Sequence, residues 1–365
     1  MNKTNFIKTI LALLLFSLQL QGQTLVHQAE IQAYLDSLSR EDFSGTVLIA
    51  KDDSIIEQRA YGLANIEYDI PNEVDTKFNI ASITKTFTAV AALQLYEQGK
   101  IDLHLPIGNY LPDYPNQLVK DSVTMHQLLS HTSGSNNFYV GNFLDTDKLQ
   151  YQSVADFVPL FAEDTLLCKP GAQYNYSASG FVIAGLIIEA VSGQNYYDYL
   201  KEHIFFPAKM GNTTELPIDS IVINKASGYT SFFGESEVLK RNESYLSKAS
   251  PGGFHYSTVE DLFHFSKALR NYQLLQKETV ELMCTPKVKG YNTHMGYGIA
   301  IDLRRNQKIQ GHSGGWYGVR GELLDFMTDH YTVVLLSNID DGGETGASKV
   351  ADFFTTLIAG EEVEK

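Results

Sequence analysis

Segments with the pattern of buried β-strands lie near both ends of this chain, and mainly helical segments lie between them. Residues 45–50 read Gly-Thr-Val-Leu-Ile-Ala, and a polar turn joins them to a second strand that ends at Tyr61. Further strands are predicted at 297–302, 309–313, 321–327 and 331–337, followed by a helix at 346–358. The sequence therefore predicts an α+β fold. An antiparallel sheet is built from both termini with flanking helices, and a mainly helical lobe is inserted at roughly residues 100–270.

The first residues have the pattern of a secretory signal peptide. Lys3 and Lys8 precede an apolar run from Ile10 to Leu18, and a polar stretch follows as far as Gly22. We expect residues 1–22 to be removed, which leaves residues 23–365 as the mature chain. Because the apolar run is too short to cross a bilayer comfortably, we expect no stable membrane span after this removal, and a periplasmic or secreted protein.

The charge balance and the cysteines limit the partners and cofactors. The chain has 28 Lys and Arg residues against 43 Asp and Glu, and its net charge of -15 gives it no general attraction for nucleic acid. The sequence has no C-x-x-C, no H-E-x-x-H and no phosphate-binding glycine loop, so we expect neither a metal nor another cofactor. An exported compartment permits a disulfide between Cys168 and Cys284, but the sequence does not show whether their geometry allows one.

A serine and a lysine three residues apart form the first candidate for chemistry. Ser82 and Lys85 would share one face of a helix, which continues with regularly spaced apolar residues and ends near Gly99. A serine hydroxyl is a weak nucleophile until a base takes its proton, and a lysine among apolar neighbours can have its pKa lowered enough to be that base. S-x-x-K alone is a weak pattern, because most examples combine a capping serine with a surface lysine.

Two later segments could complete a site with Ser82. Tyr176 is one candidate, because a lysine ammonium beside a tyrosine favours the phenolate, which can act as an acid or a base. The other is Gly-His-Ser-Gly-Gly at 311–315, where small residues allow a substrate to approach closely. There His312 could donate to an anionic group, and Gly315 could lend its backbone N–H to an oxyanion.

In this order, the three elements resemble the motifs of the serine β-lactamase and penicillin-binding protein superfamily. Its S-x-x-K, Y-x-N and K-T-G motifs correspond to Ser82-Ile83-Thr84-Lys85, Tyr176-Ser177-Ala178 and His312-Ser313-Gly314. The most similar branch contains class C β-lactamases, D-alanyl-D-alanine carboxypeptidases and related esterases, some of which carry His in the third motif. Similar stretches at 44–47, 128–134 and 207–213 extend the resemblance over nearly the whole mature chain.

The resemblance implies a β-lactamase/transpeptidase-like fold for residues 23–365 and an acyl-enzyme mechanism without a metal. Ser82 would attack a carbonyl carbon while Lys85 and Tyr176 share the proton. The backbone N–H groups of Ser82 and Gly315 would hold the oxyanion, and Ser313 and Gly314 would belong to the substrate-binding strand. Tyr176 would then protonate the leaving group, and water would hydrolyse the acyl-enzyme.

Two departures from the family's motifs bear on the substrate. Ala178 replaces an Asn whose amide usually contacts an acylamino side chain of the substrate. His312 replaces a Lys, so recognition of a carboxylate would depend on protonation of the imidazole. We therefore expect a serine hydrolase for D-Ala-type peptides, small esters or amides, with weak action on β-lactams. The alternative is a penicillin-binding sensor or scaffold of the same fold that is acylated without turnover.

Two other interpretations of these segments are weaker. Residues 311–315 also fit the G-x-S-x-G nucleophile elbow of α/β-hydrolases, but that fold needs an acid and then a distant histidine after the serine, and only His330 follows. His131 could be interpreted as a metal ligand or a base. The corresponding segment of this family looks structural, however, which favours a structural role for His131. The sequence therefore favours Ser82 as the nucleophile.

Overall fold

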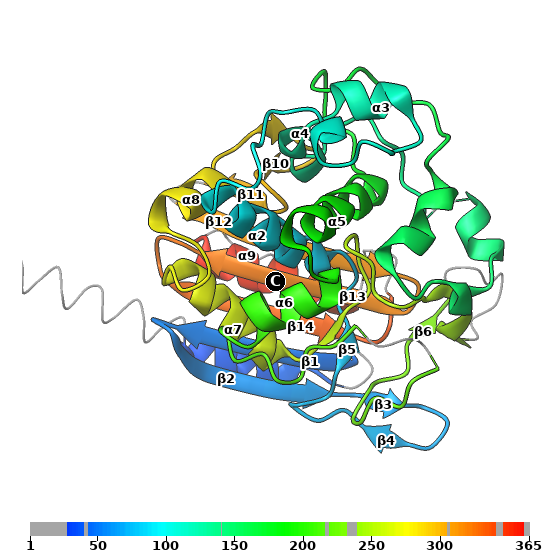
Figure 1. The fold of residues 1–365 in the computed structure, drawn as a ribbon. Coiled ribbons are helices and arrows are strands. Elements are labelled where there is room, and N and C mark those ends of the chain that lie inside the picture. Colours follow the sequence, from blue (N-terminus) through cyan, green and yellow to red (C-terminus); the bar gives the residue numbers. More distant parts are fainter. Residues whose placement is uncertain are drawn as a thin grey trace, which may run out of the picture.

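One antiparallel sheet of eight strands forms the framework of the molecule (Figure 1). The computed structural model describes residues 28–39, 43–139, 141–215, 219–231, 239–304, 307–340 and 346–360. Across the sheet the strands are β2 (Ser54–Tyr61), β1 (Gly45–Lys51), β14 (Tyr331–Ser337), β13 (Val319–Phe326), β12 (Gln307–Trp316), β11 (Ala300–Arg304), β10 (His294–Met295) and β9 (Val288–Lys289). The N-terminal hairpin and the C-terminal strands meet where β1 pairs with β14, with Gly45 opposite Ser337. The α+β fold and the sheet built from both ends of the chain are thus confirmed.

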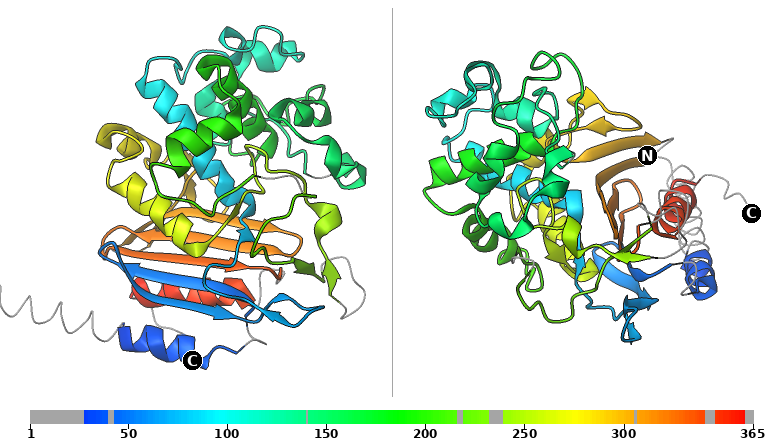
Figure 2. Two further views of the ribbon diagram at one scale, coloured as in Figure 1. Left: turned by 60° about the horizontal axis from the view of Figure 1, so that its bottom comes forward. Right: turned by 90° about the vertical axis from the view of Figure 1, so that its right-hand side faces the viewer.

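Helices cover both faces of this sheet (Figure 2). On one face lie α9 (Gly346–Ile358) and a helix over residues 28–37, and their apolar side chains form a common cluster with β1 and β14. The bounds of α9 are those predicted from the sequence. The opposite face carries the remaining helices, most of them between β5 and β9 in the chain. The predicted signal peptide, residues 1–22, lies outside the described residues.

The chain between the two groups of sheet strands is mainly helical. Its α-helices are α2 (Thr84–Glu97), α3 (Gln117–Ser122), α4 (Met125–Leu129), α5 (Ala178–Ser192), α6 (Tyr196–Leu200), α7 (Val259–Arg270) and α8 (Lys277–Met283). Short 3-10 turns are η1 (Ala81–Ile83), η2 (Ile107–Asn109), η3 (Gly141–Asp145), η4 (Lys148–Gln150), η5 (Val154–Leu160) and η7 (Glu243–Tyr245), and η6 (Lys201–Phe205) is a π-helical turn. Paired short strands are β3 (Leu63–Asn65) with β4 (Ile70–Pro71), β5 (Phe78–Asn79) with β8 (Tyr256–Ser257), and β6 (Tyr229–Thr230) with β7 (Lys240–Arg241).

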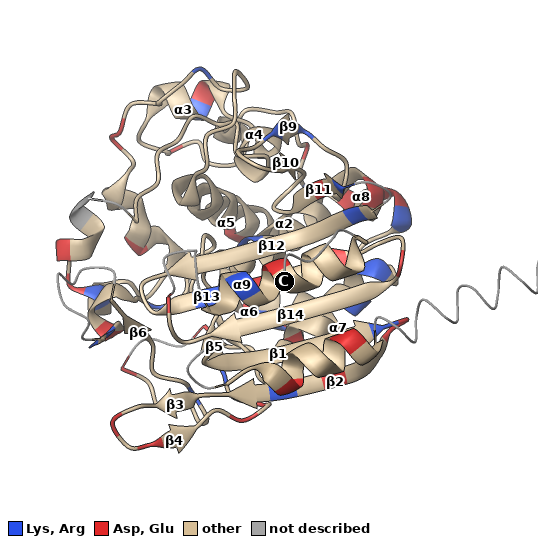
Figure 3. Ribbon diagram, turned by 180° about the vertical axis from the view of Figure 1, so that it is seen from behind, with Lys and Arg blue, Asp and Glu red and all other residues tan. Residues whose placement is uncertain are grey.

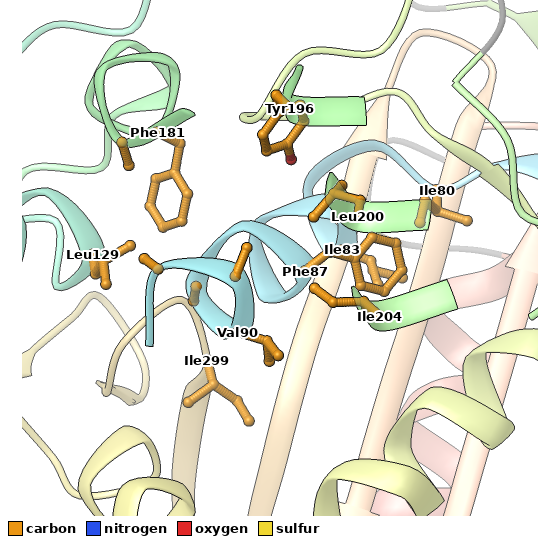
Figure 4. Close-up of a cluster of buried hydrophobic side chains, with 14 of the residues drawn as sticks. Ile80, Ile83, Phe87, Val90, Leu129, Phe181, Tyr196, Leu200, Ile204 and Ile299 are labelled. Carbon is orange, nitrogen blue, oxygen red and sulfur yellow. The ribbon is translucent and has the colours of Figure 1, made fainter. Parts of the chain in front are cut away.

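Helix α2 lies at the centre of the main hydrophobic core (Figure 4). Eleven of its 14 residues are buried, so the helix is enclosed on nearly every side. Phe87 and Val90 of α2 lie among side chains from α4, α5, α6 and the turn before β11, including Leu129, Phe181 and Ile299. This enclosure fixes the position of η1, which directly precedes α2 and carries Ser82.

The structure corrects the start of one predicted strand. The strand predicted to begin at 297 begins at Ala300, because Gly298 adopts a φ of +62° and the preceding backbone leaves the sheet. There the N–H groups of Tyr297 and Gly298 donate to the carbonyls of Met283 and Leu129.

Acidic and basic residues are interspersed along the elements seen from the side of the sheet that carries α9 (Figure 3). In the part of the chain that the structure describes, no helix combines the length and the apolar character needed to cross a bilayer.

A buried ion pair connects α7 to both parts of the sheet. Arg270 of α7 donates to Asp325 of β13 at 2.7 Å and to Asp53, in the β1–β2 turn, at 2.6 Å. Asp325 also accepts from Thr332 of β14 at 2.8 Å and from Ser266. Removing one partner of such a network leaves a buried charge unpaired, which costs far more than loss of an exposed pair.

We therefore expect Arg270→Ala to lower the free energy of unfolding by roughly 3–5 kcal/mol, since Asp325 keeps its charge in a buried site. Urea unfolding followed by the fluorescence of Trp316, the single tryptophan, measures this change. Arg241→Ala is the matched control, because Arg241 is half-exposed in its pairs with Glu67 and Glu243 and should contribute about 0–1 kcal/mol. Equal losses in the two variants would contradict the role given to the network.

Candidate active site

The turn that carries Ser82 is held in an uncommon backbone conformation. Ala81, the preceding residue, has a φ of 41°, in the left-handed region that residues with a side chain seldom adopt. Its N–H donates to the side chain of Asn79 at 2.9 Å, and its carbonyl accepts from the Phe254 N–H at 3.2 Å. Because β5 pairs with β8 directly before this turn, backbone bonds on both sides keep Ser82 at the surface of the α2 core.

Lys85 lies one turn after Ser82, as the spacing predicts. Its Nζ is 3.1 Å from Ser82 Oγ and donates to the Gly252 carbonyl at 2.5 Å. The side chain is fully buried, and this burial lowers the pKa of Lys85 to about 7. A substantial fraction of the amine is therefore neutral near pH 7 and able to accept the Ser82 proton.

Residues 250–253 form a part of the site that the sequence analysis did not assign. In this Ser-Pro-Gly-Gly turn, the Gly252 carbonyl accepts from Lys85, and the Pro251 carbonyl accepts from Thr88 of α2 at 2.8 Å. The turn is closed by paired backbone bonds between Ser250 and Gly253. The sequence signal was the Pro-Gly-Gly run itself, which marks a turn but does not reveal that the turn meets α2.

Tyr176 lies on the other side of Ser82. Its side chain hydrogen-bonds Ser82, and the Lys85 Nζ lies 4.8 Å from the centre of its ring. The expectation that the lysine would favour a tyrosine phenolate is wrong, because burial raises the pKa of Tyr176 above its usual value. Near neutral pH the residue is a phenol that can donate a proton, and Lys85 is the stronger candidate for the base.

His131 packs against the ring of Tyr176. The two rings stack with centroids 4.3 Å apart, and His131 Nδ1 accepts from the Ser177 N–H at 3.1 Å. Burial holds the pKa of His131 well below its ordinary value, so the ring is neutral. These contacts agree with a structural role.

The third predicted segment lies on β12, beside the Ser82 turn. A Cβ at Gly314 would lie 2.2 Å from the Ile80 carbonyl oxygen, so only glycine allows this approach. Pairing of β12 with β11 ends at Gly311, whereas pairing with β13 continues to Trp316. The strand edge beyond Gly311 therefore has no partner strand on the β11 side among the described residues. Ser313 and Gly315 lie on this stretch and are exposed.

His312 is buried next to the catalytic candidates, and its charge differs from the sequence expectation. Burial, aided by the nearby Lys85, lowers the pKa of His312 to about 4. Its Nδ1 contacts the Ser313 carbonyl at 2.6 Å, and its buried Nε2 has no hydrogen-bond partner among the described residues. The imidazole is thus neutral over the ordinary working range, and a charge change near pH 6.5 is not expected from it.

Ala178 begins α5 and is fully buried. It packs against the backbone of Gly252, where an added Cβ would lie 3.1 Å from the Ala178 methyl carbon. The predicted place of Ala178 on the substrate-binding surface is not tested by these contacts and stays a prediction.

A cavity of about 470 Å³ opens beside this group of residues. Tyr176, His312 and Ser313 lie in its wall. Its charged lining consists largely of ion pairs, with Arg304 at 2.6 Å from Asp302 and Arg320 at 2.8 Å from Glu322.

Two cysteines and a further buried histidine lie apart from the reacting groups. Cys168 and Cys284 are both unpaired. His255 packs beneath α2 against Phe87, and burial lowers its pKa to about 3. Among the described residues there is no cluster of three or more potential metal ligands.

Comparison with known proteins shows the family. The Beta-lactamase family model matches residues 28–352. Penicillin-binding protein 4* of Bacillus subtilis (strain 168) is 28% identical over 330 residues, which cover 86% of this chain and 72% of that protein. The mitochondrial serine beta-lactamase-like protein LACTB of Homo sapiens is 26% identical, over 76% of this chain and 67% of its own.

Solved structures agree with this assignment. A penicillin binding protein from Bacillus halodurans superposes with a TM-score of 0.78 at 30% identity, covering 86% of this chain and 97% of that one. A D-stereospecific amidohydrolase from Streptomyces sp. has a TM-score of 0.72 at 25% identity, covering 88% and 96%. These relatives support a serine hydrolase of this fold. Since the family model covers most of its length, the chain belongs to the Beta-lactamase family.

Proposed function

We propose that this protein is a serine hydrolase that forms an acyl-enzyme on Ser82. The observation that carries the proposal is the contact between Ser82 Oγ and a fully buried Lys85 Nζ at 3.1 Å. With the pKa of Lys85 lowered to about 7, the neutral amine can take the serine proton as Oγ bonds to the substrate carbonyl carbon. The oxyanion that forms would accept from the backbone N–H groups of Ser82 and Gly315.

Collapse of this intermediate requires a proton for the leaving group. Tyr176 is suited to donate it, because its phenol is protonated near neutral pH and hydrogen-bonds Ser82. The proton held by Lys85 would then return to Tyr176, whose ring centre lies 4.8 Å from the Nζ. In the second half of the reaction, water attacks the acyl carbon and gives one proton to the same pair. The bond between the acyl carbon and Ser82 Oγ then breaks as the pair returns a proton to Oγ, which releases the acid and restores Ser82.

The substrates that we propose are D-Ala-type peptides, small esters and amides, with weak action on β-lactams. Two relatives support this range by name, a penicillin-binding protein and a D-stereospecific amidohydrolase. Ala178 lacks the amide that would hold an acylamino side chain, which favours simple substrates. The export proposed from residues 1–22 would place the enzyme in the periplasm or outside the cell, where such peptides occur in cell walls.

A penicillin-binding sensor that acylates without turnover is the alternative. Incubation with a fluorescent penicillin and with p-nitrophenyl acetate, followed by mass spectrometry, separates the two. Continuous release of p-nitrophenol supports the hydrolase, whereas a stoichiometric burst with a stable adduct identifies the sensor.

The nucleophile can be tested by covalent labelling with the same penicillin. Ser82→Ala should abolish the adduct, because it removes the hydroxyl that lies 3.1 Å from Lys85 Nζ. Ser313→Ala is the matched control and should leave an adduct on Ser82, since Ser313 lies on the neighbouring strand. Labelling that survives Ser82→Ala would refute the assignment.

The pH profile of kcat/KM reports the base of the free enzyme. For p-nitrophenyl acetate we expect kcat/KM to rise with pH through about 7, because deprotonated Lys85 is the active form. A substrate with a carboxylate should show the same rise in kcat/KM through about pH 7. Its kcat/KM should show no additional change near pH 6.5, since burial lowers the pKa of His312 to about 4. A change near 6.5 confined to the carboxylate substrate would show that His312 is protonated there.

Ala178→Asn tests the substrate class. The new amide could hydrogen-bond an acylamino group, and a gain of about 1.4 kcal/mol corresponds to a tenfold rise in kcat/KM for a cephalosporin with an amide side chain. Hydrolysis of p-nitrophenyl acetate, which lacks this amide, should change little. An equal effect on both substrates would point to altered packing against Gly252 and would contradict the proposed specificity.

A further inference from the structure

The cavity beside Tyr176 has an aromatic wall that the proposed mechanism does not use. Tyr174 and Tyr291 line it, together with Met295. Tyr291 lies in the turn between β9 and β10 and is 82% exposed. The turn is closed by a hydrogen bond from the Gly290 N–H to the Thr293 carbonyl at 2.7 Å, which fixes the backbone that presents this ring.

The two tyrosine rings form a corner. Their centroids are 5.2 Å apart and their planes are perpendicular, at 90°. Aromatic rings prefer stacked and edge-to-face contacts, so a third ring in this corner could stack on one tyrosine and meet the edge of the other. On the rest of the wall, Asp302 pairs with Arg304 and Arg320 pairs with Glu322, and Asp352 is the remaining charged residue. The aromatic corner is therefore the part of the wall that is suited to bind an uncharged ring.

The position of the corner indicates which part of a substrate would reach it. Tyr174 meets the edge of His131 at 6.0 Å, and His131 stacks on Tyr176 at 4.3 Å. Tyr176 is the residue placed to protonate the leaving group. The cavity therefore lies next to the leaving group, which is the amine or alcohol released when the scissile bond breaks.

We propose that Tyr174 and Tyr291 bind an aromatic ring in the leaving group of the substrate, which makes Tyr291 a specificity-determining residue. The proposal rests on the proposed function, since it assumes that the carbonyl is attacked by Ser82. It assigns a preference for aryl-bearing amines or alcohols over aliphatic ones of the same size.

The test uses the benzyl, cyclohexylmethyl and methyl esters of D-alanine. The first two leaving groups are similar in size, and only the first is aromatic. Wild-type protein should prefer the benzyl ester over the cyclohexylmethyl ester, and Tyr291→Ala should lower this ratio of kcat/KM values about tenfold. Tyr291→Phe, which keeps the ring, should preserve the ratio.

Tyr68→Ala is the matched control, because Tyr68 is 78% exposed on the hairpin between β3 and β4 and does not line the cavity. It should leave the ratio unchanged. A benzyl to cyclohexylmethyl ratio that is the same in wild type and Tyr291→Ala would overturn the proposal.

A binding measurement separates this proposal from the proposed function. In the Ser82→Ala background, NMR line broadening of the benzyl ester should be stronger than that of the cyclohexylmethyl ester, and addition of Tyr291→Ala should remove the difference. If wild type hydrolyses none of the esters, the hydrolase proposal fails for esters, and this binding difference still decides the role of the corner. Equal broadening of the two esters would refute it.

Discussion

Burial of the Lys85 amine is the constraint on which the rest of the site depends. A shift of its pKa from 10.5 to about 7 corresponds to roughly 5 kcal/mol in favour of the neutral form. The unfolded chain would keep this lysine protonated at neutral pH, so folding must remove the proton or bury the charge. This contribution disfavours the folded state below about pH 7 and is relieved as pH rises toward 10.5. The fold loses stability at this position, where the proposed base lies beside Ser82.

The neighbouring groups are consistent with that neutral amine. His131 and His312 are both buried, and burial is the largest cause that lowers the pKa of each imidazole. Tyr176 is kept as a phenol by the same burial. Among the described residues, the Lys85 Nζ hydrogen-bonds one hydroxyl and one carbonyl and forms no ion pair with a carboxylate. The proposed proton relay around Ser82 would therefore be uncharged before the reaction, and charge would develop there only in the transition state.

The sequence allowed prediction of those parts of the site that depend on local spacing. Ser82 and Lys85 are three residues apart on one helix face, and their side chains are in contact as this spacing predicts. The apolar patterns at 45–50 and 331–337 predict strands, and these residues form the paired strands β1 and β14. Ionisation could not be predicted in the same way. The charge state of Tyr176 and His312 depends on how completely segments distant in sequence exclude water from the two side chains. The local residue pattern does not reveal the extent of this burial. The Gly252 carbonyl was missed for a related reason, since it lies 167 positions from Lys85.

One part of the site lies on the sheet and another lies on the helical segments, and the two parts are in close contact. The Ser82 turn is held by Ala81 at a φ of 41°, while β12 reaches it only because Gly314 has no Cβ to strike Ile80. A strained turn is retained when the surrounding structure holds its backbone in place. Here α2 in the core and the β5–β8 pair both hold the Ser82 turn. In the Tyr174–Tyr291 corner, by contrast, Tyr291 lies on an exposed turn at the edge of the sheet. Such turns tolerate change better than the core does, so specificity can vary at that edge while the Ser82–Lys85 geometry stays fixed.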